Sequence, residues 1–477
     1  MVSCFQKGVI SVIKGTGSQS GTELISRLDR IPIWPFGNMV LWVIGMGFLV
    51  SFYDITNVAF ALPNIAKHFH LSAAASAIPV TASLLGYILG SYLNSTLADM
   101  KGRRNAIISA TILFTIGSLA TTFAFNLDWL VLWRFITGMG IGAEIAAIAT
   151  YMGELAPAPV RGRYTGLANI WSFTGLAVVP FIALALITHF SWGWRGMFFV
   201  GALGGLTLIW AVRIPESPRW LLAHGRLEEA EAVVRDGEER ARRKLGGKLP
   251  EPALLADESH DSSFPTSAMF RAPYLGRWIL LLFIWVFMYL SDYAWLGMAP
   301  TLLVDKGYSL ANSIVFLLVT GIGYPIGAIL SAWFGDRFER KYSILVGILV
   351  YALSLAAFGL FPSAATIFIA GFILSVALVF FFPLLYALTA ESFPTHARAT
   401  GVSFTDGIGH VGGALAPIFT LAIYAAFGHT GFLMAFMYMA VTAIICAILL
   451  PFGVAATRKS LEVVHKESAE PVGAVSR

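Results

Sequence analysis

Twelve apolar runs dominate this sequence, and each is long enough to cross the hydrocarbon core of a bilayer as a helix, which takes about 20 residues. Only 12% of the 477 residues are charged, about half the share found in soluble domains. The runs begin near Asn38, Ala73, Asn105, Leu127, Tyr164, Arg195, Gly276, Leu310, Tyr342, Ala364, Ala399 and Thr430. We therefore predict an all-α integral membrane protein with twelve transmembrane helices.

A polar stretch divides the runs into two groups of six. The predicted segments are a tail (1–37), a six-helix bundle (38–213), a central loop (214–275), a second six-helix bundle (276–454) and another tail (455–477). Inside the loop, Pro218–Val234 has the pattern of one or two short amphipathic helices around Gly225. The charged and Gly/Pro-rich sequence from Arg235 to Ser263 predicts a mobile segment.

Basic residues gather in alternate loops, all on one side of a twelve-span topology. They are Lys101, Arg103, Arg104, Arg161, Arg163, Arg240, Arg243, Arg337, Arg340, Lys341, Arg398 and Arg458. Cytoplasmic loops carry an excess of Lys and Arg. We therefore expect both termini and the central loop to lie on the cytoplasmic side of an inner membrane.

The two halves of the chain repeat each other at an offset of 237 positions. Asp99 falls on Asp336, Glu154 on Glu391, and Arg161 on Arg398. Small apolar residues coincide often by chance in such a chain, whereas two acids and an arginine at one shared offset do not. We predict two parallel six-helix repeats, an arrangement typical of transporters that alternate access at a cleft between the halves.

Four motifs occur in order along the first half. They are Ser95-x3-Asp99-Met100-Lys101-Gly102-Arg103-Arg104, Arg134-Phe135 with Gly138, Gly140 and Gly142, Glu154-x2-Pro157-x3-Arg161-Gly162, and Pro215-Glu216-Ser217-Pro218-Arg219-Trp220. Together they resemble the major facilitator superfamily, and within it the sugar-porter, organic-ion and metabolite–proton symporter branches. Two positions depart from the family pattern, since Ser95 stands where Gly is usual and Met100 where Arg is usual.

The resemblance implies that charged loop residues form a cytoplasmic gate of ion pairs, which holds the halves together in one state and separates in the other. The implied gate residues are Asp99, Arg103, Arg104, Glu154, Arg161, Glu216, Arg219, Asp336, Arg337, Glu391 and Arg398. The alternative is that these residues only set the membrane topology.

Ionisable side chains within a span are costly and therefore point to function. Asp54 lies on the first predicted helix and Arg134 on the fourth. In the resembled proton-coupled sugar porters, an Asp and an Arg at these positions form the coupling pair, so the resemblance implies a proton-coupling role for both. The alternative is a static ion pair. Glu144 lies nearer the cytoplasm and could belong to the gate.

Polar residues of the helices that line the cavity in the resembled fold are candidates for substrate binding. They are Tyr53, Asn57, Asn169, Asp292, Asp406 and His410. Asp292 could equally face an outer vestibule. Asp406 and His410 share a helix face at i and i+4, so His410 could instead be a packing residue that is hydrogen-bonded to Asp406.

Sugar porters carry a paired glutamine motif on helix 7 and a glutamine on helix 5. Here those regions read Ser291-Asp292-Tyr293 and Asn169, which disfavours a sugar. A small organic acid would use Arg134 as its anchor, and an organic cation would use Asp292 or Asp406. We expect proton-coupled symport of a small polar metabolite, with an organic acid slightly favoured and a sugar or an organic cation as alternatives.

Other classes of function find little support. We find no nucleophile–base constellation and no nucleotide-binding loop, so we predict a transporter and not an enzyme, with no cofactor. The two cysteines, Cys4 and Cys446, predict neither a disulfide framework nor a metal site. A drug exporter, a uniporter and a transporter-like sensor remain alternatives. The expected partners are the bilayer, a small-molecule substrate and protons, without nucleic acid, and the protein is expected to work as a monomer.

Overall fold

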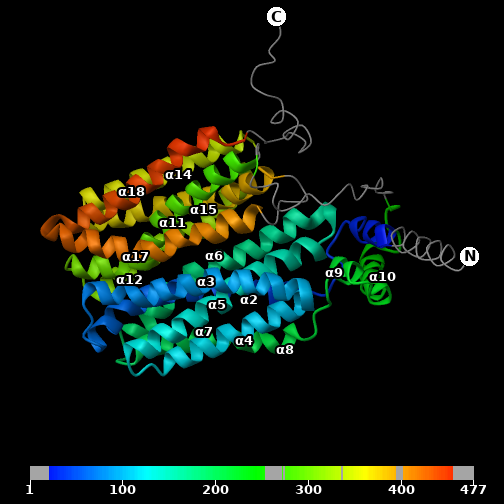
Figure 1. Ribbon diagram of the computed structural model, residues 1–477, viewed down its shortest axis with the longest axis horizontal. Coiled ribbons are helices and arrows are strands. Elements are labelled where there is room, and N and C mark those ends of the chain that lie inside the picture. The colour runs from blue at the N-terminus through cyan, green and yellow to red at the C-terminus, as the bar shows by residue number, and fades with distance from the viewer. Residues whose placement is uncertain (1–20, 253–270, 272–273, 335–336, 394–400, 455–477) are drawn as a thin grey trace, which may run out of the picture.

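The computed structural model describes residues 21–252, 271, 274–334, 337–393 and 401–454. Within these ranges every regular element is a helix (Figure 1). Twelve of the described helical stretches are long and apolar enough to cross a membrane, which confirms the predicted number. The predicted gate residues Asp336 and Arg398 lie outside the described residues.

The first six spans form one bundle, drawn in blue to green in Figure 1. Their helices are α2 (Asn38–His68), α3 (Ala73–Lys101), α4 (Arg103–Thr122), α5 (Leu127–Leu155), η1 (Ala158–Val160) with α6 (Arg161–Ile187), and α7 (Gly193–Ala202) with η2 (Leu203–Thr207) and α8 (Leu208–Ala211). Side-chain caps start two of them, because Ser72 accepts from the Ala75 N–H and Asn126 from the Trp129 N–H.

The last six spans form the second bundle, drawn in green to red. Their helices are α11 (Tyr274–Asp305), α12 (Leu310–Gly321) with α13 (Gly323–Phe334), α14 (Arg340–Leu360), α15 (Ala364–Glu391), η5 (Ser403–Gly407) with α17 (Ile408–Ala426), and η6 (Gly428–Thr430) with α18 (Gly431–Leu449) and η7 (Leu450–Phe452). η5 is a single π-helical turn, and such turns are frequent at functional sites. It contains the predicted site residue Asp406.

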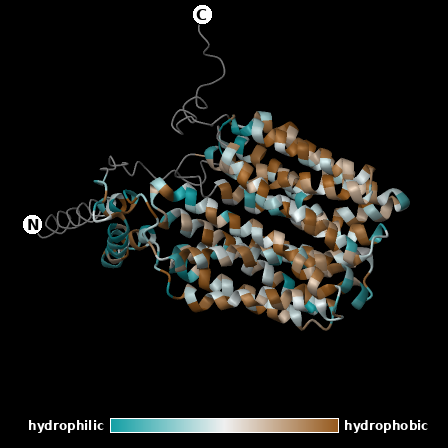
Figure 2. Cartoon of the chain, turned by 180° about the vertical axis from the view of Figure 1, so that it is seen from behind, coloured by the Kyte–Doolittle hydropathy of each residue, from teal (hydrophilic) through white to brown (hydrophobic). Residues whose placement is uncertain are grey.

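Polar sequence gathers at the two ends of the helices, while apolar sequence fills the length between them (Figure 2). We call the end that carries Lys101, Arg103, Arg161 and Arg340 the basic end. The short helices α9 (Pro218–Ala223) and α10 (Leu227–Leu245) also lie at this end.

Glycine permits close helix packing at several places, most clearly between α3 and α5. A Cβ atom at Gly86 would lie 2.0 Å from the Phe135 carbonyl oxygen, and one at Gly142 would lie 2.2 Å from the Tyr87 carbonyl oxygen. Only glycine allows such backbone approach. This packing fixes the side chains of α3 and α5 relative to each other, including Tyr87 and Arg134.

Among the described residues, the main contacts between the two bundles join α3 with α17 and η5, α2 with α11, and α6 with α12 and α13. Thr81 donates a hydrogen bond to the Ala414 carbonyl at 2.9 Å, and the rings of Tyr87 and His410 stack with centroids 4.2 Å apart. These contacts lie in the middle of the molecule and toward the end opposite to the basic end.

The prediction for the central loop was only partly right. α9 and α10 flank Gly225, whose φ of +72° suits glycine in the tight connection. However, α10 continues to Leu245, through residues predicted to be mobile. The extension is stable because Val234 and Ala241 are buried beside the segment 21–36, whose buried residues are Leu24, Leu28, Ile31, Trp34 and Phe36.

Candidate transport site

Asp54 of α2 and Arg134 of α5 form an ion pair inside the first bundle. Asp54 Oδ1 lies 3.0 Å from Arg134 Nη1, and both side chains have 0% exposure. Ser118 Oγ donates to Asp54 Oδ2 at 2.6 Å, and Arg134 Nε donates to Ser83 Oγ at 2.9 Å. A buried charge is tolerated when it is paired and hydrogen-bonded in this way.

Arg134 also reaches the interface between the halves. It lines a small cavity together with Tyr87 of α3 and with Tyr293 and Gly297 of α11. Its guanidinium lies 5.3 Å from the centre of the Phe198 ring, and Nη2 donates to the Asp54 carbonyl oxygen at 3.2 Å. Its hydrogen-bonding groups are thus engaged with Asp54 and Ser83 while it stands beside a space that both halves share.

A second polar group, which we call the aromatic cluster, has four residues in the second half and one, Tyr87, on α3 of the first half. It consists of Asp406, His410, Tyr289, Tyr386 and Tyr87. The Tyr289 and Tyr386 hydroxyls both donate to Asp406 Oδ1, the latter at 2.8 Å. The Asp406 side chain is 17% exposed, so this carboxylate is accessible, in contrast to Asp54.

His410 joins the aromatic cluster to the first half. Its Nδ1 lies 2.9 Å from the Asp406 carbonyl oxygen, which selects the tautomer that carries hydrogen on Nδ1. The ring lies 4.2 Å from that of Tyr87 and 4.0 Å from that of Tyr289, measured between centroids. His410 is therefore held between aromatic rings of both bundles. Its hydrogen bond goes to the backbone of Asp406, while the Asp406 carboxylate, which the i, i+4 spacing offered as a partner, lies 3.7 Å from Nδ1.

The other candidates for substrate binding do not join these groups. The Tyr53 hydroxyl donates to the Met197 carbonyl at 2.9 Å inside the first bundle. Both amide atoms of Asn57 are buried without a hydrogen-bond partner, as is Asp292 Oδ1. Asn169 is half-buried on α6. Buried unpaired polar atoms are costly, which makes Asn57 and Asp292 sites where a water or another ligand would be stabilised.

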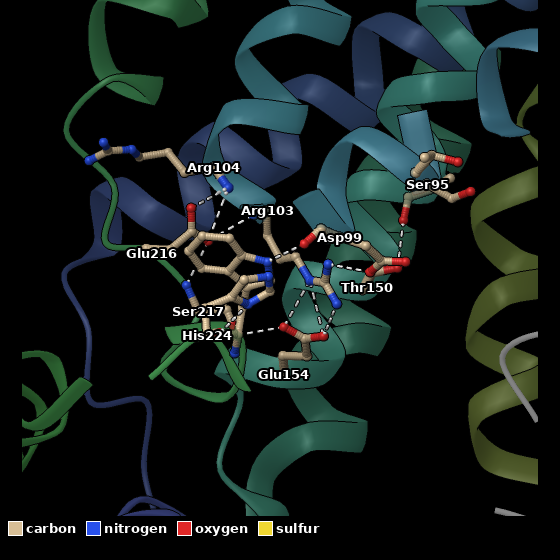
Figure 3. A network of polar contacts seen from close by, with 12 residues as sticks. Ser95, Asp99, Arg103, Arg104, Thr150, Glu154, Glu216, Ser217 and His224 are labelled. Atoms are coloured by element: carbon tan, nitrogen blue, oxygen red, sulfur yellow. Dashed lines mark hydrogen bonds and ion pairs between the residues drawn. The ribbon is translucent and has the colours of Figure 1, made fainter. Parts of the chain in front are cut away.

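The predicted gate residues of the first half form a network at the basic end (Figure 3). Arg103 lies 2.7 Å from Asp99 and 2.8 Å from Glu154, and Ser217 donates to Glu154. Glu216 accepts from the backbone N–H groups of Arg103 and Arg104 at 2.8 and 3.2 Å. Its carboxylate therefore caps the N terminus of α4, where negative charge is favoured.

The remaining gate residues have different partners. Arg161 and Arg219 both contact Asp29, at 3.4 and 2.7 Å. In the second half Glu391 pairs with Arg340, while Arg337 lies over the Phe334 ring. None of these described ion pairs, and none of those in Figure 3, joins the first six-helix bundle to the second.

Several functional contacts were missed from the sequence. Asp29 was placed in a tail, although it is the counter-charge of two predicted gate arginines. Arg340 stands out in the sequence only as one of the basic loop residues, and no motif marks Tyr87. One signal was present in the sequence. Tyr289 and Tyr293 are four positions apart, as are Asp406 and His410, so each pair shares one face of its helix.

Known proteins support the assignment that this geometry suggests. A family model described as sugar (and other) transporter matches residues 39–467. The chain is similar to the niacin transporter NiaP of Acinetobacter baylyi, with 29% identity over 93% of this chain and 99% of the relative. It is also similar to the 4-hydroxybenzoate transporter PcaK of Pseudomonas aeruginosa, with 28% identity over 77% of this chain and 82% of the relative.

The solved structures agree on the fold. The inward-open xylose transporter XylE from E. coli superposes with a TM-score of 0.71 at 20% identity, and the match covers 90% of this chain and 99% of the other. This supports the major facilitator fold predicted from the repeat and the motifs. The protein is a multi-pass membrane transporter and not an enzyme, and the chain belongs to the sugar (and other) transporter family.

Proposed function

We propose that the protein is a proton-coupled symporter that carries a small organic acid across the inner membrane. The observation that carries this proposal is the Asp54–Arg134 ion pair, which has 0% exposure on both sides and whose arginine lines a cavity shared with Tyr87 and Tyr293. The two bundles, 38–213 and 276–454, would rock about this cavity, with the basic end in the cytoplasm.

The pair links a proton to an anion in a simple way. Protonation of Asp54 removes its charge and leaves the Arg134 guanidinium without its counter-ion in a low-dielectric site. A substrate carboxylate that enters the cavity can then take the place of Asp54 at Nη1. Proton and anion would bind together with no net change in buried charge, and neither would bind well alone.

The relatives and the aromatic cluster favour a ring-bearing acid. NiaP and PcaK are named for niacin and 4-hydroxybenzoate, both of which combine an aromatic ring with a carboxyl group. The rings of Tyr87, Tyr289 and His410 offer flat faces on which such a ring could stack. Nicotinate is therefore the first probe that we would use.

One observation favours a second candidate, an organic amine. Asp406 is the accessible acid, and its carboxylate accepts hydrogen bonds from the hydroxyls of Tyr289 and Tyr386, which also bring two aromatic rings to the site. Carboxylate and aromatic faces together suit a cation. An amine would bind at the aromatic cluster and would not require Arg134.

Alternating access would use the charged residues of the basic end. The contacts between the halves lie in the middle and toward the opposite end, while the described ion pairs at the basic end stay within their own halves. We infer that this state is open to the cytoplasm. In the outward-open state these side chains, together with Asp336 and Arg398, would pair across the halves and close the basic end.

The test uses purified protein in proteoliposomes. Radiolabelled nicotinate uptake is measured under an imposed proton gradient, with and without a protonophore, while a thermal-shift screen compares organic acids, amines and sugars. A bound ligand raises the melting temperature by mass action. We expect stabilisation by nicotinate that disappears in Arg134→Lys, and uptake that the protonophore abolishes.

Three results would contradict the proposal. Uptake that is unaffected by the protonophore would remove proton coupling. Stabilisation by amines alone, lost in Asp406→Asn and retained in Arg134→Lys, would replace the organic acid with an organic amine, and stabilisation by sugars alone would replace it with a sugar.

A further inference from the structure

A second buried acid, Glu144, lies in the first bundle and has no part in the contacts described above. It is on α5 and is 2% exposed. Ser51 Oγ of α2 lies 2.8 Å from its Oε2, and Thr111 Oγ1 of α4 lies 2.9 Å from its Oε1. Its carboxyl group thus sits where three helices meet, and it touches one hydroxyl on each side.

The surroundings of Glu144 suit a neutral acid. No Lys, Arg or His side chain among the described residues pairs with it, and an unpaired carboxylate inside a membrane is costly. Thr111 Oγ1 also lies 2.9 Å from the Ile107 carbonyl oxygen. The Thr111 hydroxyl can therefore donate its hydrogen bond to that carbonyl. Its oxygen is then free to accept a hydrogen bond from a protonated Oε1 of Glu144, while Ser51 donates to Oε2.

Glu144 belongs to the same seam as the Asp54–Arg134 pair. Ser51, which contacts Glu144, lies three positions from Asp54 on α2. On α4, Thr111 contacts Glu144 and Ser118 contacts Asp54, and these two residues are seven positions apart. Both spacings keep side chains on one helix face. The rise of an α-helix separates Thr111 and Ser118, the α4 partners of the two acids, by about 10 Å along the helix axis, with the Glu144 partner nearer the basic end.

The elements around Glu144 supply few other titratable groups. α2 contributes Asp54 and α3 contributes Tyr87, whose backbone packs against Gly142. α4 contributes the hydroxyls of Thr111, Thr115 and Ser118. On α5 itself the nearest charged residues are Arg134 and Glu154, each ten residues away, and Tyr151 lies seven residues away toward the basic end. Glu144 is thus the first acid that a proton leaving Asp54 along the seam toward the basic end would meet.

We propose that Glu144 is a second proton-binding site of the transporter, which holds a proton while Asp54 is paired with Arg134 and exchanges protons with Asp54 along the α2–α4–α5 seam. The proposal rests on the proton-coupled function proposed above. Binding of the proton forms one O–H bond at a Glu144 carboxyl oxygen, and release breaks that bond. The proton is exchanged with Asp54 on one side and with water at the basic end on the other.

Infrared spectroscopy of the reconstituted protein tests this without any substrate. The infrared spectrum of the wild type minus that of Glu144→Gln should show a carboxylic-acid C=O band at neutral pH. This band should shift in deuterium oxide. Thr111→Val, which removes one hydrogen-bond partner, should move this band, whereas Asp292→Asn, which removes a buried acid outside the seam, should leave it in place. Alkaline titration should convert the band to carboxylate.

Communication with Asp54 is tested in the same experiment. Asp54→Asn leaves the Arg134 charge without its partner about 15 Å from Glu144, which should change the pH midpoint of the Glu144 band by about one pH unit. In transport, Glu144→Gln should lower gradient-driven nicotinate accumulation about tenfold while it preserves nicotinate exchange.

A Glu144 that is ionised at neutral pH, or that stays protonated throughout the titration, would overturn the proposal. So would an unchanged midpoint in Asp54→Asn. These spectral results stand whether or not nicotinate is carried, so a failure of the proposed function, seen as wild-type uptake that ignores the proton gradient, is distinguishable from a failure of this inference.

Discussion

The two halves share a backbone plan but not the same chemistry. At the repeat offset of 237, the residues of the buried polar seam, Ser51, Asp54, Thr111, Ser118, Arg134 and Glu144, fall on Met288, Ser291, Ile348, Leu355, Gly371 and Phe381. One acid–arginine pair and one further acid are thus replaced by a serine, a glycine and large apolar groups. The second half fills the same space with rings, since Tyr351 and Phe381 pack edge to face with centroids 5.9 Å apart.

The reverse comparison holds for the aromatic cluster. Tyr289, Asp406 and His410 fall on Phe52, Asn169 and Phe173 of the first half, which lack its acid and its imidazole. What the repeat preserves is the helix plan and the charged motifs of the basic end. Together with the proposed function, this difference leads us to propose a division of labour, in which the first half would handle protons and the second half would supply most of the surface for the substrate.

The largest expected effect comes from removing the buried cation of the seam. Arg134→Ala should destabilise the protein by about 3–5 kcal/mol, because it leaves Asp54 buried without its partner. Thermal unfolding in detergent would measure this. The double variant Asp54→Asn/Arg134→Ala should recover part of the loss, and the absence of any recovery would show that the cost comes from packing and not from an unpaired charge.

A smaller effect is expected in the aromatic cluster. Asp406→Asn removes the charge that two tyrosine hydroxyls contact, which should weaken nicotinate binding about tenfold without changing its dependence on the proton gradient. Equilibrium binding and uptake would measure the two effects. A variant that abolished proton dependence would move the coupling site into the second half and contradict the comparison.

The gate network predicts a contrast between two acids. Glu216→Gln weakens the cap on α4 and should cost about 0.5–2 kcal/mol in stability. Asp99→Asn should cost less, because the Asp99 side chain is 74% exposed and exposed ion pairs contribute little. Melting temperatures of the two variants would check the order, and equal losses would show that Glu216 is no more important than Asp99 for this end of the bundle.

The smallest effect concerns the docked segment 21–36 and its pH dependence. Burial disfavours ionised Glu238, but Arg27 and Arg30 outweigh it and hold the pKa of Glu238 below its usual range. A lowered folded-state pKa gives stability that is present above the ordinary carboxyl pKa and is lost as the pH falls through the folded value. Relative to the intrinsic exchange rate at each pH, the amides of residues 21–36 should therefore lose protection at acidic pH in wild type and be weakly protected at all pH values in Glu238→Gln.

The sequence predicted the plan of the fold well, because span length, basic loops and the 237-residue offset each depend on local sequence. It also predicted the Asp54–Arg134 contact, through the resemblance. It did not predict the contacts of Asp29, which depend on how a segment before the first span folds back onto α9 and α10. Nor could it separate Tyr289 and Tyr386 from other aromatic residues, because their role depends on which side chains share one interface.

The measurement that tests the division of labour most directly compares Asp54→Asn with Asp406→Asn in proteoliposomes, in both gradient-driven accumulation and exchange of nicotinate. We predict that Asp54→Asn loses accumulation and keeps exchange, whereas Asp406→Asn lowers both in proportion and remains sensitive to a protonophore. The opposite pattern, with exchange without accumulation in Asp406→Asn and normal accumulation in Asp54→Asn, would place the coupling site in the second half and contradict the account.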